Sequence, residues 1–152
     1  MFTIRPATTA DVDAIVRHRC EMYRAMGCTD EKALDGVADN CRPYFQSGIA
    51  DGTYRAWMAV VADGRIVGGG GVGLIAWPGN PRDPLCRRAI ILNMYVEPEF
   101  RRRGIARALM QTMVDWCRKE GLVTVDLHAS HEGRPLYESM GFRPTNEMRL
   151  TL

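Results

Sequence analysis

Residues 89–106 read AIILNMYVEPEFRRRGIA, and this stretch, with the residues that follow it, decides the fold. Its beginning, Ala89 to Val96, is an almost wholly apolar run, which is typical of a strand buried on both faces. Residues 105–120 carry apolar side chains at helical spacing, and Gly121 supplies a helix end. Leu122 to Ala129 has the composition of a second strand. The sequence therefore predicts a strand–helix–strand unit of about 40 residues.

An arginine-rich turn joins the first strand of this unit to its helix. Arg101, Arg102 and Arg103 stand directly before Gly104. The N-terminus of a helix presents unpaired N–H groups and a partial positive charge, and a glycine lets the backbone approach a bound group closely. The turn matches neither the P-loop pattern nor the Rossmann GxGxxG pattern. It predicts an anion site suited to a pyrophosphate, although three arginines taken alone fit a solvated charge run equally well.

The rest of the chain predicts further strands and helices around this unit. Asp63-Gly64 is a strong hairpin signal. Four consecutive glycines, Gly68 to Gly71, allow two interpretations: a bulge or close packing within the sheet, or room for a ligand beside it. The expected elements are strands at 2–5, 55–62, 65–75 and 148–152, a helix after Thr8, one or two irregular helices within 26–50, a loop at 77–88 and a short helix at 134–140.

Composition places the chain among ordinary globular domains. Its 152 residues, 46% of them apolar, fit one domain, residues 1–152. A net charge of +2 gives little attraction to nucleic acid or to a membrane surface, so neither is expected as a partner. The five cysteines form no CxxC pair, and His128 and His131 lack a third ligand nearby, so we expect no disulfide framework and no metal. With no signal-peptide pattern at the start, a reducing cytoplasm is the expected setting.

Two motifs resemble the GNAT superfamily of acetyl-CoA-dependent N-acetyltransferases. Val96 to Ala106 matches the signature V-x-P-x-x-[RQ]-x-x-G-x-[GA], and Leu136 to Phe142 (LYESMGF) matches a second signature in the right order and spacing. The opening residues Ile4 to Ala7 also look like the first strand of that family. The resemblance implies an α/β (α+β) domain. Its central sheet would be mixed and mostly antiparallel, flanked by helices, with a splayed parallel strand pair at the cofactor site.

The resemblance also implies where acetyl-CoA binds. Backbone groups of one strand would bond the pantetheine arm where a bulge splays that strand from its neighbour. Backbone N–H groups of the arginine-rich turn would hold the pyrophosphate, so the arginine side chains need not matter much. Ser130 stands where many relatives carry an asparagine that contacts the cofactor. The implied cofactor-binding residues are Met94, Tyr95, Val96, Arg101, Arg102, Arg103, Gly104, Ile105, Ala106, Arg107 and Ser130.

In the family a neutral amine attacks the thioester directly, so a proton acceptor for the amine and an acid for the leaving thiolate are needed. Tyr137 matches the family's tyrosine placed to protonate that sulfur; the alternative is a tyrosine that only packs the short helix. Some relatives carry a glutamate base on the central strand, but residues 89–92 contain no carboxylate. His128 is our candidate base, because histidine titrates close to neutral pH. Other candidates are Asp126, Glu21, Tyr23 and Asn93 acting through a bound water.

The expected function is transfer of the acetyl group of acetyl-CoA to a primary amine of a small molecule or a protein. Two alternatives remain open: a CoA-binding module with a regulatory role in place of catalysis, and a toxin-like enzyme that acetylates aminoacyl-tRNA. The nearly neutral net charge gives the tRNA alternative no particular support. Homodimers are common in such families, and the sequence selects neither a dimer surface, an acceptor nor an acyl-chain length.

Overall fold

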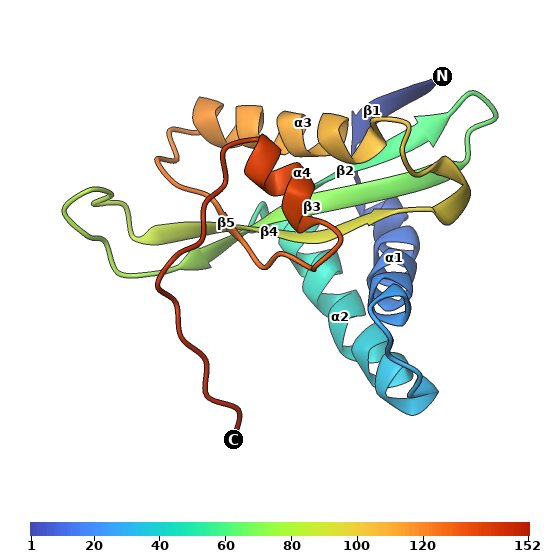
Figure 1. Ribbon diagram of the computed structural model, residues 1–152, viewed down its shortest axis with the longest axis horizontal. Helices are drawn as coiled ribbons and strands as arrows, with labels where there is room; N and C mark the ends of the chain where they lie inside the picture. The colour runs from blue at the N-terminus through green and yellow to red at the C-terminus, as the bar shows by residue number, and fades with distance from the viewer.

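A five-stranded sheet in the order β1-β2-β3-β4-β5 forms the centre of the protein (Figure 1). The computed structural model describes all residues, 1–152. Strands β1 to β4 pair antiparallel with one another, and only β4 and β5 run parallel. The mixed, mostly antiparallel sheet predicted from the sequence is therefore confirmed. The strands are β1 (Phe2–Pro6), β2 (Tyr54–Val61), β3 (Ile66–Ala76), β4 (Arg87–Val96) and β5 (Asp126–Leu127).

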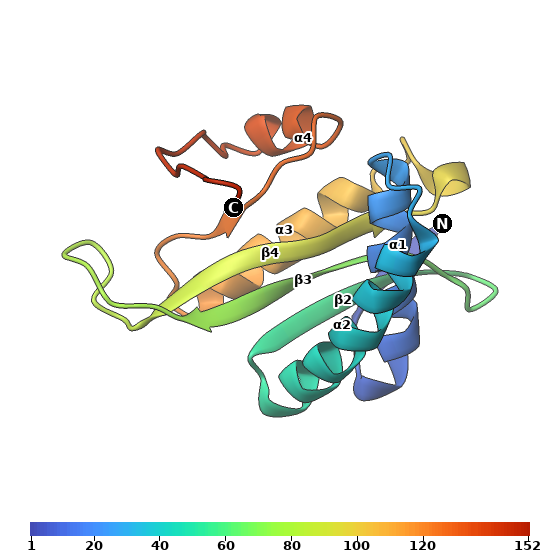
Figure 2. The same cartoon turned by 90° about the horizontal axis from the view of Figure 1, so that it is seen from below.

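Helices cover both faces of the sheet. One face carries α1 (Val12–Ala25) and α2 (Glu31–Asp51), and the other carries α3 (Ile105–Lys119), as the view from below shows (Figure 2). The short α4 (Arg134–Ser139) follows β5 in the chain and lies next to α3 (Figure 1). Two 3-10 turns, Thr9–Asp11 and Pro98–Phe100, precede α1 and the arginine-rich turn. No helix combines the length and the apolar character that crossing a membrane requires.

Each face of the sheet has its own apolar core. The face under α3 buries Leu109, Met113 and Cys117, which follow the helical spacing seen in the sequence, against β3 and β4. The opposite face buries Phe45 of α2 against Tyr54 of β2, with their ring centroids 4.8 Å apart. The sheet is thus packed on both faces, and β4 lies between the two cores.

The glycine row of β3 serves close packing. A Cβ atom added at Gly71 would lie 2.3 Å from the hydroxyl oxygen of Tyr54, and one added at Gly68 would lie 2.9 Å from the carbonyl oxygen of Tyr95. At Gly70 the nearest atom is the sulfur of Met94, at 2.4 Å. The space beside these glycines is filled by neighbouring side chains and backbone. The packing interpretation is therefore correct for this row, and the interpretation as ligand space is wrong.

Several predicted elements differ from the structure. Residues 26–50 do not form irregular helices: Glu31–Asp51 is one continuous helix despite Pro43, and Asp30 caps it by accepting a hydrogen bond from the N–H of Ala33 (3.0 Å). This helix is stable because Phe45 and Gly48 pack on the sheet, which overrides the low helix propensity of its sequence. The strand expected at 122–129 shortens to two residues, Asp126–Leu127.

The strand expected at 148–152 was predicted wrongly. Residues 142–152 form no helix or strand, although Met148, Leu150 and Leu152 alternate with polar residues as in a strand. A strand forms only where a neighbouring edge pairs with it, and none pairs here.

Replacing Gly71 by alanine tests the packing of the glycine row. We expect Gly71→Ala to lower the free energy of unfolding by about 1–3 kcal/mol, because the new methyl group meets the fully buried ring of Tyr54. Gly36→Ala is the matched control: no atom lies within 4 Å of the added Cβ on α2, so stability should stay equal or rise by up to about 1 kcal/mol. Urea denaturation measures both. Equal effects of the two substitutions would contradict the packing interpretation.

Candidate active site

A bulge in β4 lies at the centre of the candidate site. Gly69 pairs with Tyr95 and Gly71 pairs with Leu92, so β4 places two residues, Asn93 and Met94, opposite the single Gly70. Asn93 takes the left-handed conformation, with φ 64°, which is uncommon for a residue other than glycine. Such an extra residue bends the strand and increases its twist. The bulge on which the predicted pantetheine site depends is present.

The bulge coincides with the point where the two parallel strands separate. β4 pairs with β5 only at Ile90–Asp126 and Ile91–Leu127. Beyond Ile91 no strand lies on the β5 side of β4, so the backbone edge of residues 93–96 is left without a strand partner there. An extended ligand carrying amide groups, such as pantetheine, can bond to an edge of this kind as an added strand would.

The arginine-rich turn presents a run of backbone donors. The N–H groups of residues 102–107 bond to no backbone or side-chain acceptor of the chain. Two positive φ angles, 62° at Arg102 and 82° at Gly104, shape the turn, and Gly104 caps α3 without a side-chain cap. Consecutive free N–H groups at the start of a 15-residue helix form a concave anion site that the helix dipole strengthens. This arrangement fits a pyrophosphate.

Three arginine side chains in and beside the turn make contacts within the protein. Arg101 Nε donates to the carbonyl oxygen of Val96 (3.0 Å), and Arg107 donates from Nη2 to Ser139 Oγ (2.7 Å), which ties α3 to α4. The guanidinium of Arg103 lies 5.3 Å from the ring centroid of Phe100. These contacts support the expectation that backbone groups, more than arginine side chains, would bind the phosphates.

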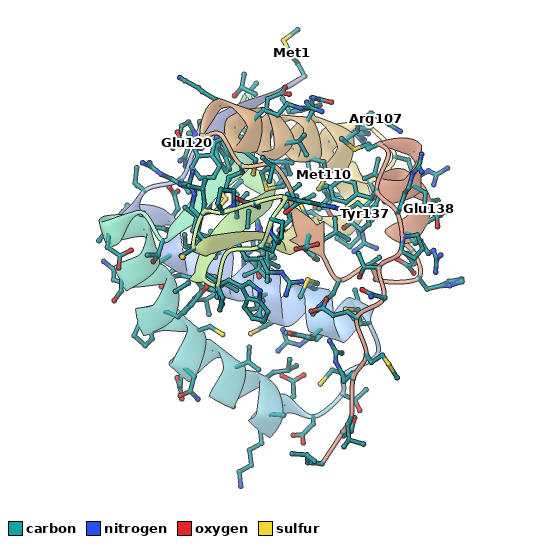
Figure 3. All side chains as sticks on the ribbon, turned by 90° about the vertical axis from the view of Figure 1, so that its left-hand side faces the viewer. Met1, Arg107, Met110, Glu120, Tyr137 and Glu138 are labelled. Atoms are coloured by element: carbon teal, nitrogen blue, oxygen red, sulfur yellow. The ribbon has the colours of Figure 1, made fainter.

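Tyr137 projects from α4 toward the sheet, whereas its neighbour Glu138 points outward (Figure 3). Its ring is half-buried and lies 6.1 Å from the ring of Phe142, edge to face. Gly133 leaves room for it, since an added Cβ there would lie 2.9 Å from the tyrosine ring. Burial raises the pKa of the Tyr137 hydroxyl above its ordinary value of about 10, so the hydroxyl is protonated at neutral pH and can donate a proton.

Ser130 and Asp126 are engaged within the protein. Ser130 Oγ accepts a hydrogen bond from the N–H of Gly133 (3.1 Å) and so supports the turn that leads into α4. Asp126 is ion-paired with Arg88, 2.8 Å from its Nε, and is therefore not a free proton acceptor. His128 lies just after β5 with an exposed side chain that forms no hydrogen bond. A cofactor contact for Ser130 and a base role for His128 both stay proposals.

The other candidate bases differ in whether their polar atoms already have a partner within the protein. Glu21 is paired with Arg24 (2.7 Å), and the Tyr23 hydroxyl accepts a hydrogen bond from Arg19 (3.1 Å). Asn93 donates from Nδ2 to the carbonyl oxygen of Ile15 (3.0 Å), while its Oδ1 is buried without a hydrogen-bond partner. An unpaired acceptor at the bulge can hold a water molecule next to the reacting atoms. Asn93 thus keeps an acceptor atom without a partner, whereas Glu21 and Tyr23 each have an arginine partner.

The sequence assigns no site role to a histidine that lies buried beside the bulged strand. His18 of α1 is completely buried, and its ring lies 5.0 Å from the ring of Tyr95, whose hydroxyl donates to Glu97 Oε2 (3.2 Å). Burial, with Arg17 nearby, lowers the pKa of His18 to about 4, so it is neutral at neutral pH. Nothing in the local sequence marks His18, because its neighbours come from a strand about 80 residues away.

Comparison with known proteins shows which family has this fold and these motifs. The chain belongs to the GNAT acetyltransferase family: the sequence model of the acetyltransferase (GNAT) domain matches residues 53–144. A GCN5-related N-acetyltransferase from Ralstonia eutropha JMP134 has a similar crystal structure, with 36% identity and a TM-score of 0.92, covering 100% of this chain and 99% of that one. A predicted acetyltransferase with acetyl-CoA from Clostridium acetobutylicum gives 25% identity and a TM-score of 0.89, covering 100% and 96%.

Curated relatives match over shorter stretches. The [Ribosomal protein bS18]-alanine N-acetyltransferase of Escherichia coli K12 is 37% identical over 57 residues, which are 36% of this chain and 38% of that protein. The chain spans less than two fifths of the length of the first curated relatives that it matches.

Gly104→Glu tests the anion site. We expect loss of acetyl-CoA binding with the fold retained, because a carboxylate at the turn repels phosphate and blocks its approach, while no atom of the protein lies within 4 Å of the added Cβ. Gly121→Glu is the matched control, since Gly121 also has a positive φ (73°) and open space but follows the far end of α3. Calorimetric titration with acetyl-CoA measures both variants. Unchanged affinity in a folded Gly104→Glu protein would contradict the assignment.

Proposed function

We propose that this protein transfers the acetyl group of acetyl-CoA directly to a primary amine. The observation that carries the proposal is the set of unbonded N–H groups at residues 102–107, beside a strand that is bulged and separated from its parallel neighbour. Membership of the GNAT acetyltransferase family supports it, as does the relative crystallised with acetyl-CoA.

The residues present fit acetyl-CoA. The N–H groups of 102–107 would hold the pyrophosphate, and the backbone of Met94, Tyr95 and Val96 would bond the pantetheine arm along the free edge of β4. When bound, acetyl-CoA supplies the thioester carbon that the amine attacks. The strand and the helix start are both fixed by the core under α3, so the two halves of the site are preorganised relative to each other.

Proton transfer is the chemistry left to side chains. Tyr137, protonated and half-buried on the sheet side of α4, would donate its proton to the sulfur of the leaving thiolate. A water held by Asn93 Oδ1, or His128 directly, would take the proton of the amine. Tyr137 must be protonated to act as the acid, and burial raises its pKa above about 10. Deprotonation of Tyr137 should therefore lower the activity of the enzyme only above about pH 10.

The intact tyrosine favours an enzyme over a non-catalytic acyl-CoA-binding module. A regulatory module would need the anion site and the strand edge, but it would not need a half-buried, protonated phenol on α4. We further propose that the enzyme acts in the cytoplasm, where its five free cysteines stay reduced, and that it forms a homodimer.

Tyr137→Phe separates catalysis from binding. Removing one hydroxyl should lower kcat by about 100-fold or more, because the leaving thiolate loses its proton donor, while acetyl-CoA affinity stays within a few-fold of wild type. Thiol release across a panel of amines measures kcat, and calorimetry measures affinity. Glu138→Gln, one residue away on the outer side of α4, is the matched control and should leave both unchanged.

The same assay tests the proton acceptor. A tenfold or larger fall of kcat in His128→Ala would assign the base role to His128, whereas an unchanged kcat would leave it to the water at Asn93. Wild-type kcat in Tyr137→Phe would contradict the acid role, and binding of acetyl-CoA without thiol release on any amine would favour the regulatory module.

A further inference from the structure

Polar atoms without partners gather on the face of the sheet that α1 and α2 cover. Arg19 Nε, the Tyr54 hydroxyl and Asn93 Oδ1 are all buried and form no hydrogen bond. They come from α1, β2 and the bulge of β4. A buried polar atom without a partner is costly, and several of them in one region indicate a ligand that supplies the missing partners.

These side chains lie close to one another. Asn93 bonds to the carbonyl oxygen of Ile15, which stands one helical turn, about 5 Å, before Arg19 on α1. The rings of Tyr44 and Tyr54 are 6.2 Å apart. An added Cβ at Gly71 would lie 2.3 Å from the Tyr54 hydroxyl, and Gly71 pairs with Leu92, the residue before Asn93, so this hydroxyl lies near the bulge. Tyr44, beside Tyr54, is half exposed.

Arg19 has no acidic partner. It donates from Nη2 to the Tyr23 hydroxyl (3.1 Å) and its guanidinium lies 5.3 Å from that ring centroid, but it takes part in no ion pair. Its helix neighbours Arg17 and Arg24 are paired with glutamates. A half-buried guanidinium without a carboxylate is suited to bind one from a ligand, and its planar fork matches carboxylate and phosphate oxygens.

We propose that Arg19 binds an anionic group of the acceptor, so that the substrate is a small amine that also carries a carboxylate or a phosphate. This proposal rests on the proposed acetyl transfer. Ile15, whose carbonyl oxygen bonds to Asn93, and Arg19 are about one helical turn apart on α1. A molecule of metabolite size can therefore place its amine at the bulge and its anionic group at the guanidinium. Tyr44 and Tyr54 would add hydroxyl contacts to the same molecule.

Matched acceptor pairs test this proposal. An amino acid and its amide differ only in the carboxylate, and an amino sugar phosphate and its free amino sugar differ only in the phosphate. We expect wild type to prefer the anionic member of at least one pair by about tenfold or more in kcat/KM, and Arg19→Gln to remove the preference by raising KM for the anionic member alone. Arg24→Gln removes a charge from the outer side of the same helix and should keep the preference.

Binding measurements separate this proposal from the proposed function. Titration of each acceptor into the CoA-bound protein gives its affinity without turnover, and acetyl-CoA affinity should be the same in Arg19→Gln and wild type. Equal affinity for both members of every pair, or an anion preference that survives in Arg19→Gln, would overturn the role of Arg19. Failure to bind acetyl-CoA would instead overturn the proposed function.

Discussion

The extra residue that β4 places opposite Gly70 is the constraint on which the rest of the site depends. It turns Asn93 toward α1 and lets the strand leave its parallel neighbour after Ile91, so that one backbone edge becomes free. The glycine row of β3 tolerates this distortion because Met94 and Tyr54 occupy the space that side chains on β3 would need. The bulge therefore connects the packing of both cores with the opening between β4 and β5.

The groups available to bind an anion are backbone N–H groups more than the side chains of the arginine-rich turn. Arg101 and Arg107 are bonded to Val96 and Ser139, whereas the N–H groups of 102–107 have no partner. The contact of Arg107 also fixes α4 to α3 and with it the helix that carries Tyr137. A single helix start thus organises both the anion site and the position of the proposed acid.

The sequence predicted what depends on local pattern and missed what depends on contacts between distant segments. The helix that buries Leu109 and Met113 follows from its spacing, and the turn at Gly104 follows from a glycine before a helix. The length of α2 could not be predicted, because packing on the sheet outweighs Pro43. The hydrogen bond from Asn93 to the carbonyl oxygen of Ile15, 78 residues apart and without a shared motif, is likewise visible only in three dimensions.

Hydrogen exchange of the backbone amides tests the central claim most directly. The N–H groups of 102–107 have no acceptor in the protein, so they should exchange quickly in the free protein and slowly once acetyl-CoA is bound. The free edge of β4 at residues 94–96 should be protected with them, while the amide of Gly121, at the far end of α3, should not change. Saturating acetyl-CoA that leaves exchange at 102–107 unaltered would contradict the account.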